Sequence, residues 1–156
     1  MIPTACRCLL GVLLVVMLAP VSSATARPPP PAHREFLEAW QRVQSGAPDE
    51  PDPPALQHHL LYDYLLAARL RRDLQRAPDD ALDARIAGFV ESRADLPVVR
   101  PLRREWLLSL GARARWDLFL PLTAGSADAQ LQCQRFAGRL ATAETAGLGA
   151  EVLARW

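Results

Sequence analysis

The sequence predicts an all-α fold in a single domain, and three observations support this. The chain has 156 residues, 50% hydrophobic and 22% charged, which suits one globular domain and excludes a disordered chain. Alanine and leucine are frequent whereas aromatic residues make up only 6%, so the composition favours helix over strand. Apolar residues recur at helical spacing, while no segment alternates apolar and polar residues and no Asn-Gly turn occurs.

The first 26 residues have the three parts of a secretory signal peptide. A short start with Arg7 precedes the uncharged apolar run Leu9 to Leu18, and Ala24-Thr25-Ala26 offers small residues for cleavage. As a helix, this run rises only about 15 Å, against about 30 Å for the hydrocarbon core of a bilayer, so a membrane anchor is disfavoured. We expect export to the periplasm with cleavage after Ala26.

The charge balance and the cysteines narrow the function classes further. Cleavage removes one of the 18 basic residues and none of the 17 acidic ones, so the mature chain is neutral and unlike a dedicated nucleic-acid binder. Of the three cysteines only Cys133 remains after cleavage, which excludes an internal disulfide. We expect a reduced, largely buried thiol, because Leu131, Phe136 and Leu140 surround Cys133 at helical spacing.

Two proline clusters enclose a predicted first helix. Residues 27–33 are expected to form an extended spacer and Ala47 to Pro54 a loop, because closely spaced prolines oppose both helix and strand. Between the clusters, four apolar residues recur at helical spacing: Phe36, Leu37, Trp40 and Val43.

A longer helix is predicted from Pro54 to about Arg76. Its apolar residues share one face: Leu60, Leu61, Tyr64, Leu65 and Ala68. Its last turns carry a cluster of arginines: Arg69, Arg71, Arg72 and Arg76. Cations near a helix C-terminus interact favourably with the helix dipole, so this cluster has an ordinary structural explanation.

Two further helices are predicted from their N-terminal signals. Asp79 is a candidate cap for the third helix, and Pro101 suits the first turn of the fourth, where its missing N–H is not needed. Leu96-Pro97 separates the two helices. The expected buried residues of the third are Leu82, Ile86, Phe89 and Val90, and those of the fourth are Leu102, Trp106, Leu107 and Leu110.

The remaining sequence predicts three short helical segments. Arg115 to Leu122 is apolar and interrupted by Pro121. Gly125-Ser126 is expected to cap the next helix, whose buried residues would be Leu131, Phe136 and Leu140. A last helix, from about Glu144 to Trp156, contains the apolar residues Leu148, Val152, Leu153 and Trp156.

Helices of this length with short breaks predict stacked antiparallel pairs that form an irregular α-superhelix over residues 34–156. No repeat of fixed period is present, so the chain is not a consensus tetratricopeptide array. A closed helical bundle fits the periodicity almost as well.

The residues by themselves indicate no catalytic, cofactor or metal site. His58 and His59 are adjacent and point about 100° apart on a helix, so they cannot bind one metal together, and His33 is distant in sequence. Cys133 has no neighbouring histidine that would activate it, and no phosphate-binding loop occurs. The tryptophans and tyrosines lie on apolar stripes and are expected in the core. The acids Asp49, Glu50, Asp52, Asp79 and Asp80 are interpreted as loop and cap residues rather than as a catalytic pair.

The order of anchor residues along the chain gives more information than any single motif. The anchors are Tyr62-Asp63-Tyr64-Leu65, Phe89-Val90, Leu96-Pro97, Leu102, Trp106-Leu107, Arg115-Trp116-Asp117, Phe119, Gln132-Cys133, Val152-Leu153 and Trp156. This pattern resembles the N-terminal part of the soluble lytic murein transglycosylases, exported bacterial enzymes that cleave peptidoglycan glycan strands. The similarity extends from about Glu35 to Trp156.

The resemblance implies a U-shaped superhelical domain, which in that family precedes a linker and a lysozyme-like catalytic domain. The family's non-hydrolytic reaction forms a 1,6-anhydromuramyl product with one glutamate of a Glu-Ser-x-Phe motif. Glu91-Ser92 is followed here by Arg93-Ala94 and lacks the companion motifs, so no catalytic residue is carried over.

The resemblance also sets the expected partners. We expect the chain to be a fragment or frameshifted product of a longer enzyme, truncated before the catalytic domain and inactive alone. Its expected partners are peptidoglycan glycan strands, bound weakly or indirectly, and the missing catalytic domain or another periplasmic protein; a cysteine beyond the end is a candidate partner for Cys133. The alternative is a stand-alone periplasmic helical-repeat binding module.

Overall fold

A computed structural model describes residues 30–155, and this part of the chain consists of helices and connecting loops without a strand. The all-α prediction is therefore confirmed, whereas the predicted signal peptide lies outside the described residues. The helices are α1 (Pro31–Ser45), α2 (Pro54–Gln57), α3 (Tyr62–Arg76), α4 (Asp80–Ser92), α5 (Val99–Ala112), α6 (Trp116–Leu122), α7 (Ala129–Ala141) and α8 (Leu148–Arg155).

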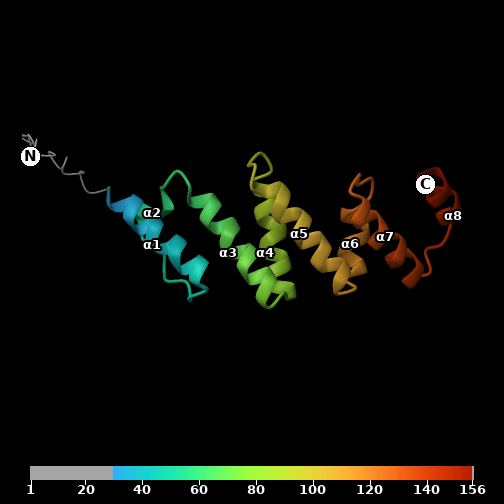
Figure 1. The fold of residues 1–156 in the computed structure, drawn as a ribbon, viewed down its shortest axis with the longest axis horizontal. Coiled ribbons are helices and arrows are strands. Elements are labelled where there is room, and N and C mark those ends of the chain that lie inside the picture. Colours follow the sequence, from blue (N-terminus) through green and yellow to red (C-terminus); the bar gives the residue numbers. More distant parts are fainter. Residues whose placement is uncertain (1–29, 156) are drawn as a thin grey trace, which may run out of the picture.

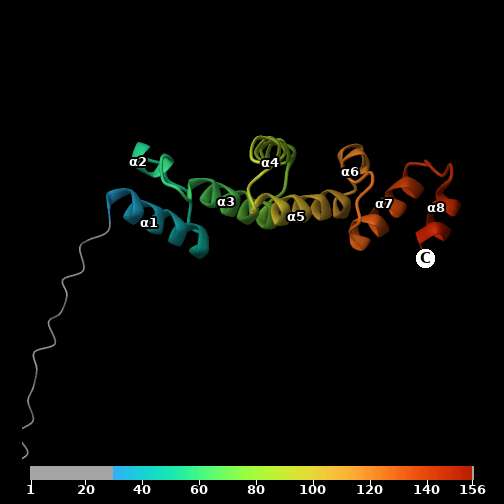
Figure 2. The same cartoon turned by 90° about the horizontal axis from the view of Figure 1, so that it is seen from above.

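The helices form an elongated row in chain order, with α1 and α8 at opposite ends (Figure 1). Seen from above, α1, α3, α5 and α7 follow one another in one layer, and α2, α4 and α6 lie to one side of it (Figure 2). The main contacts join each of these long helices to the next long helix and to the shorter helix between them. This open arrangement agrees with stacked pairs rather than a closed bundle, while a superhelical path of the pairs remains a prediction.

The core is divided into two clusters along the row. The first joins α1, α2 and α3 through Phe36, Ala39, Val43, Leu56 and Leu65. The second joins α3 to α7 through Ala67, Leu70, Leu74, Leu82, Ile86, Leu102, Trp106, Leu107, Leu110, Phe119, Leu120 and Leu131. Because α3 contributes to both clusters, it connects the first pair of helices to the rest of the row.

The ends of α1 show why it forms where it does. The helix begins at Pro31, a residue suited to the first turn because the N–H that proline lacks is not needed there. The last three residues of the predicted spacer, 31–33, therefore belong to the helix. It ends at Gly46, whose φ of 72° is left-handed and whose N–H donates to the carbonyl of Val43. Phe36 and Val43 are buried as predicted, whereas Leu37 is exposed.

The predicted helix from Pro54 to Arg76 is wrong, because a turn divides it into α2 and α3. His58 donates from Nδ1 to the carbonyl of Pro54 (2.7 Å), and Nδ1 of His59 accepts from the N–H of Leu61 (3.2 Å). These side-chain hydrogen bonds stabilise the turn. As a result, Leu60 is 92% exposed and Leu61 is also exposed, contrary to their predicted burial.

The predictions for α4 and α5 are confirmed. The Asp79 carboxylate accepts from the N–H of Leu82 at 2.7 Å and caps α4, and Pro101 lies in the first turn of α5. Leu82 and Ile86 are buried, while Phe89 and Val90 pack at the edge of the core. The four predicted inward residues of α5 are all buried: Leu102, Trp106, Leu107 and Leu110.

A buried carboxylate joins α4 to α5. Asp83 is 2% exposed and accepts from Nε1–H of Trp106 at 2.9 Å. The Arg113 guanidinium donates to both carboxylate oxygens of Asp83, at 2.7 and 3.0 Å. The buried charge is therefore both paired and hydrogen-bonded, as burial of a carboxylate requires.

The helical face that α7 buries differs from the prediction. Its cap is Asp128, which accepts from the N–H groups of Gln130 and Leu131, rather than Gly125-Ser126. Gly138 lies against the Trp116 ring, where a Cβ would stand 2.7 Å from the nearest ring atom. This close approach sets the buried face of α7, so Leu140 is 61% exposed and Phe136 is only half-buried.

The last helix, α8, begins at Leu148, later than the predicted Glu144. Leu148 is buried and Val152 is half-buried, whereas Leu153 is 82% exposed. Trp156 lies outside the described residues.

Candidate functional site

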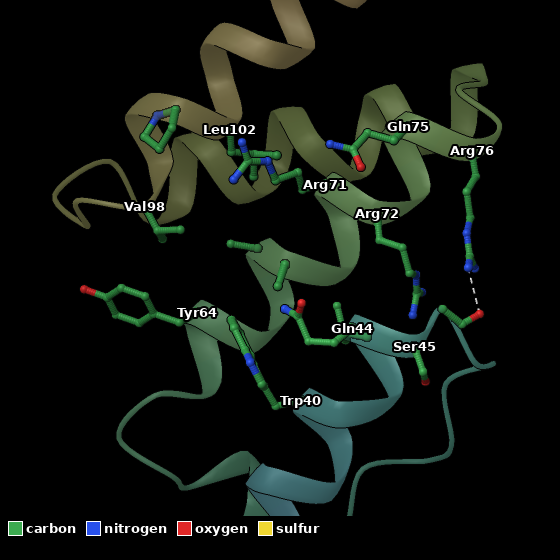
Figure 3. A pocket seen from close by; sticks show the side chains of 15 residues that line it. Trp40, Gln44, Ser45, Tyr64, Arg71, Arg72, Gln75, Arg76, Val98 and Leu102 are labelled. Carbon is green, nitrogen blue, oxygen red and sulfur yellow. Dashed lines mark hydrogen bonds between the residues drawn. The ribbon is translucent and has the colours of Figure 1, made fainter.

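A groove of about 600 Å³ lies between α1, α3 and the first turns of α5 (Figure 3). The short side chains of Ala67 and Ala68 line it where α3 passes between the other two helices. Figure 3 shows Tyr64 and Val98 at one end of the groove and Ser45, Arg72 and Arg76 at the other. The groove therefore follows the surface of α3 between the two neighbouring helices.

Aromatic and amide side chains line this groove. Trp40 and Gln44 come from successive turns of α1, and Tyr64 and Gln75 come from α3. Trp40 and Tyr64 are half-buried, whereas both glutamines are exposed and no hydrogen bond of either amide is present in the described structure. Trp40 stacks on Phe36, with ring centroids 5.9 Å apart, which holds the indole in place.

Three arginines line the groove, and no acidic residue does. Arg71 pairs with Glu105 of α5, which lies outside the lining, with Nε 2.6 Å from Oε2. Arg72 binds Asp49 through two hydrogen bonds of 2.8 and 2.9 Å. Arg76 donates to the carbonyl of Gly46 at 2.8 Å, and no carboxylate of the described residues lies within 4.0 Å of its guanidinium. The end of the groove at Arg76 therefore carries an unneutralised positive charge.

An ion-pair network fixes the proline-rich loop beside this end of the groove. The buried Arg69 binds both carboxylate oxygens of Asp52, at 2.6 and 2.8 Å, and its Nε lies 3.1 Å from Asp49. Tyr62 donates its hydroxyl to Asp52 at 2.8 Å. Arg69 and Arg72 therefore bind loop acids, which is a more specific role than the predicted interaction with the helix dipole.

The network changes the proton affinity of both loop acids. The hydrogen bond from Arg72 lowers the pKa of Asp49, and that from Arg69 lowers the pKa of Asp52, because each favours the charged carboxylate. Tyr62 lowers the pKa of Asp52 further. Desolvation opposes these effects without reversing them.

Acidification is therefore expected to destabilise the fold through Asp49 and Asp52. Their folded pKa values lie below the ordinary value of 3.8, so the stabilisation is complete above that pH and is lost as the pH falls through the folded pKa values. Urea unfolding of the wild type at pH 6, 4 and 3, beside the Asp49→Asn, Asp52→Asn double variant, measures the effect. The variant should lose less stability between pH 4 and pH 3; equal losses would contradict the assignment.

The acids considered in the sequence have the structural roles expected for loop and cap residues. Besides Asp49 and Asp52, Glu50 pairs with Arg42 at 3.3 Å. Asp80 is exposed and pairs with Arg115. Neither pair forms a cleft in which one carboxylate could act as an acid and a second as a base.

Glu91-Ser92 lies at the end of α4. Glu91 is exposed, and the Ser92 hydroxyl donates to the carbonyl of Gly88 at 2.7 Å. Glu91 and Ser92 therefore have the contacts of an ordinary helix C-terminus.

The rings of His33 and His59 lie close together, although the two residues are distant in sequence. Their ring centroids are 5.8 Å apart, and His59 stacks on Phe36 at 4.6 Å. The described residues contain no group of three or more potential metal ligands. The His59 ring thus stacks on Phe36 of the first core cluster, and the His33 ring lies tilted against His59.

The prediction that Cys133 is buried is wrong, because its side chain is exposed. On a helix, Cys133 is rotated by about 200° from Leu131, and Leu140 by about 180° from Leu131. Because Leu131 is buried, Cys133 and Leu140 face away from the buried side of α7.

Sequence reasoning did not find the groove. Trp40 and Tyr64 were expected in the core, yet both are half-exposed and line the groove. One signal was available, because Tyr64, Ala68, Arg71 and Gln75 follow each other at three- and four-residue steps and form one face of α3. The opposite wall could not be found in this way, since it comes from other helices.

Comparisons of this chain with protein-family models, with curated proteins and with solved structures find no match. No helix among residues 30–155 combines the length and hydropathy that a membrane crossing requires. The functional assignment accordingly depends on the residue pattern and on the geometry of the groove.

Proposed function

We propose that this chain is the helical scaffold of an exported lytic murein transglycosylase, and that it contacts peptidoglycan without cleaving it. The resemblance of the anchor residues to that family motivates the proposal, and the open row of helices supports it. In such a row each helix buries its apolar face only against its neighbours, which leaves long surfaces free for a large polymer.

The observation that carries the proposal is where the anchors lie in the fold. Several of them are the side chains that hold successive helices together: Leu65, Leu102, Trp106, Leu107 and Phe119. A pattern of this kind constrains the packing of the whole row rather than a single helix. The position of these anchors in the core supports an architecture shared with the N-terminal domain of the family.

The chemistry is assigned to the family's catalytic domain rather than to these helices. Glycosidic bond cleavage needs a carboxylic acid directed into a cleft that holds the sugar. The lining of the groove has no acidic side chain, and the loop acids beside it are bound by arginines. The groove therefore suits binding, and the reaction belongs to a Glu-Ser-x-Phe motif elsewhere.

The proposal is tested on the polypeptide that contains this sequence in its source organism. An antibody against the chain is used to precipitate that polypeptide, which is then incubated with purified sacculi. We expect mass spectrometry to detect released 1,6-anhydromuropeptides and to find Arg27 as the first residue of the precipitated polypeptide. A precipitate that is retained on sacculi and releases nothing would instead favour the stand-alone binding module.

The stand-alone module remains the second candidate because the groove is complete within this chain. All of its lining residues lie between Trp40 and Leu102. Binding to the groove would therefore not need a catalytic domain. A precipitate that neither binds sacculi nor releases muropeptides would contradict both functions.

A further inference from the structure

We propose that the groove between α1, α3 and α5 binds an N-acetylated sugar that carries a carboxylate, such as a muramyl residue with its attached peptide. The choice of ligand depends on the proposed function, whereas the position and chemistry of the site come from the groove itself. Within the row, this assigns the recognition of glycan strands to the first three long helices.

The aromatic and amide side chains suit the sugar part of such a ligand. A tryptophan beside a groove offers a flat apolar surface for the C–H face of a sugar ring, and Trp40 is held in place by its stacking on Phe36. Gln44 lies one turn after Trp40 and Gln75 lies on α3. Each amide has donors and an acceptor, which match hydroxyl and acetamido groups.

The charge of the groove suits the carboxylate part. Arg76 has a free positive charge at one end, with only the Gly46 carbonyl as its hydrogen-bond partner in the described structure. A guanidinium binds a carboxylate in bidentate geometry, and the remaining donors of Arg76 are available for this. The absence of acidic side chains from the lining removes the repulsion that an anionic ligand would otherwise meet.

The dimensions of the groove agree with this ligand. Ligand sites in proteins commonly have volumes of roughly 300–1,000 Å³. A groove of about 600 Å³ falls within that range, and it is open along α3 rather than enclosed. An open groove allows a polymer to continue beyond the bound unit.

The test measures binding of three soluble probes to the full chain by calorimetry. The probes are the disaccharide dipeptide GlcNAc–MurNAc–L-Ala–D-isoGlu, an N-acetylglucosamine tetramer without a carboxylate, and the dipeptide alone. We expect the disaccharide dipeptide to bind most tightly, because it engages both the aromatic wall and Arg76. Absence of binding, or binding of the dipeptide alone with equal affinity, would overturn the proposal.

Variants then locate the binding in the groove. Gln44→Ala is expected to weaken the binding of the disaccharide dipeptide about fivefold, and Arg76→Gln about tenfold. These factors correspond to the usual contributions of neutral and charged hydrogen bonds. The matched controls are Gln41→Ala and Arg34→Gln, which remove the same groups from exposed positions of α1 outside the groove and should bind like the wild type.

A variant that removes no polar group separates binding from folding. Ala68→Met fills the groove beside Trp40 and should abolish binding while the helical circular-dichroism spectrum is retained. Groove variants that bind as tightly as the wild type would overturn the site. The proposed function would still be judged separately, by release of anhydromuropeptides from the precipitated polypeptide.

Discussion

Replacing Asp83 by alanine is expected to lower the free energy of unfolding by about 3–5 kcal/mol, the usual cost of removing one partner of a buried ion pair. The change leaves Nε1–H of Trp106 and the Arg113 guanidinium without their acceptor between α4 and α5. The indole N–H of Trp106 is buried and has no other acceptor in the described structure, whereas Arg113 keeps only its contact with Ser109. Urea unfolding at pH 7, followed by circular dichroism, measures the loss.

Asp95 provides the matched control for this prediction. It is an exposed acid with no hydrogen bond or ion pair in the described structure. Asp95→Ala removes the same charge and should change the free energy of unfolding by no more than about 0.5 kcal/mol. Similar losses in the two variants would show that the buried contacts of Asp83 contribute nothing.

Replacing Arg69 by methionine is expected to cost about 3 kcal/mol, because it leaves the largely buried Asp52 without its cationic partner. Methionine keeps much of the apolar stem of the arginine, so the loss reports mainly on the ion pair. The loop from Ala47 to Pro53 should then be held less tightly to α3, by the remaining bonds of Arg72 and Tyr62. Increased cleavage of this loop by a protease, together with a lower urea midpoint, measures the effect.

Arg71 lies two residues further along α3 and serves as the control for Arg69. Its side chain is about half exposed and pairs with Glu105 near the surface. Arg71→Met should therefore cost at most about 1 kcal/mol, as exposed ion pairs do. A loss as large as that of Arg69→Met would indicate that burial of the pair is not what determines its contribution.

The boundaries of α4 and α5 could be predicted because local interactions set them. The Asp79 cap needs only the first turn of its own helix, and Pro101 needs only a position without an N–H partner. The break between α2 and α3 is also local, yet it depends on hydrogen bonds of His58 and His59 that compete with a continuous apolar face. Hydrophobic periodicity does not report such competition.

The face that α7 buries and the groove both depend on contacts between helices. Gly138 allows Trp116 to approach closely, and this pairing decides which side of α7 is buried. The groove likewise needs side chains of α1, such as Trp40, and of α3, such as Arg76, along one surface, and no helical period connects residues so far apart in sequence. For the same reason the sequence showed both the arginine cluster of α3 and the loop acids Asp49 and Asp52, but not that they pair.

The succession of contacts along the row has a consequence for how the protein folds. Because each long helix meets mainly its immediate neighbours, most of the native contacts join residues that are close in sequence. Such topologies have low contact order and fold rapidly, with structure able to start at any pair and spread to the next. The terminal helices have a neighbour on one side only, so the free energy of their local unfolding should be the lowest in the row. The slowest amide hydrogen exchange is thus expected in α5, between the two ends.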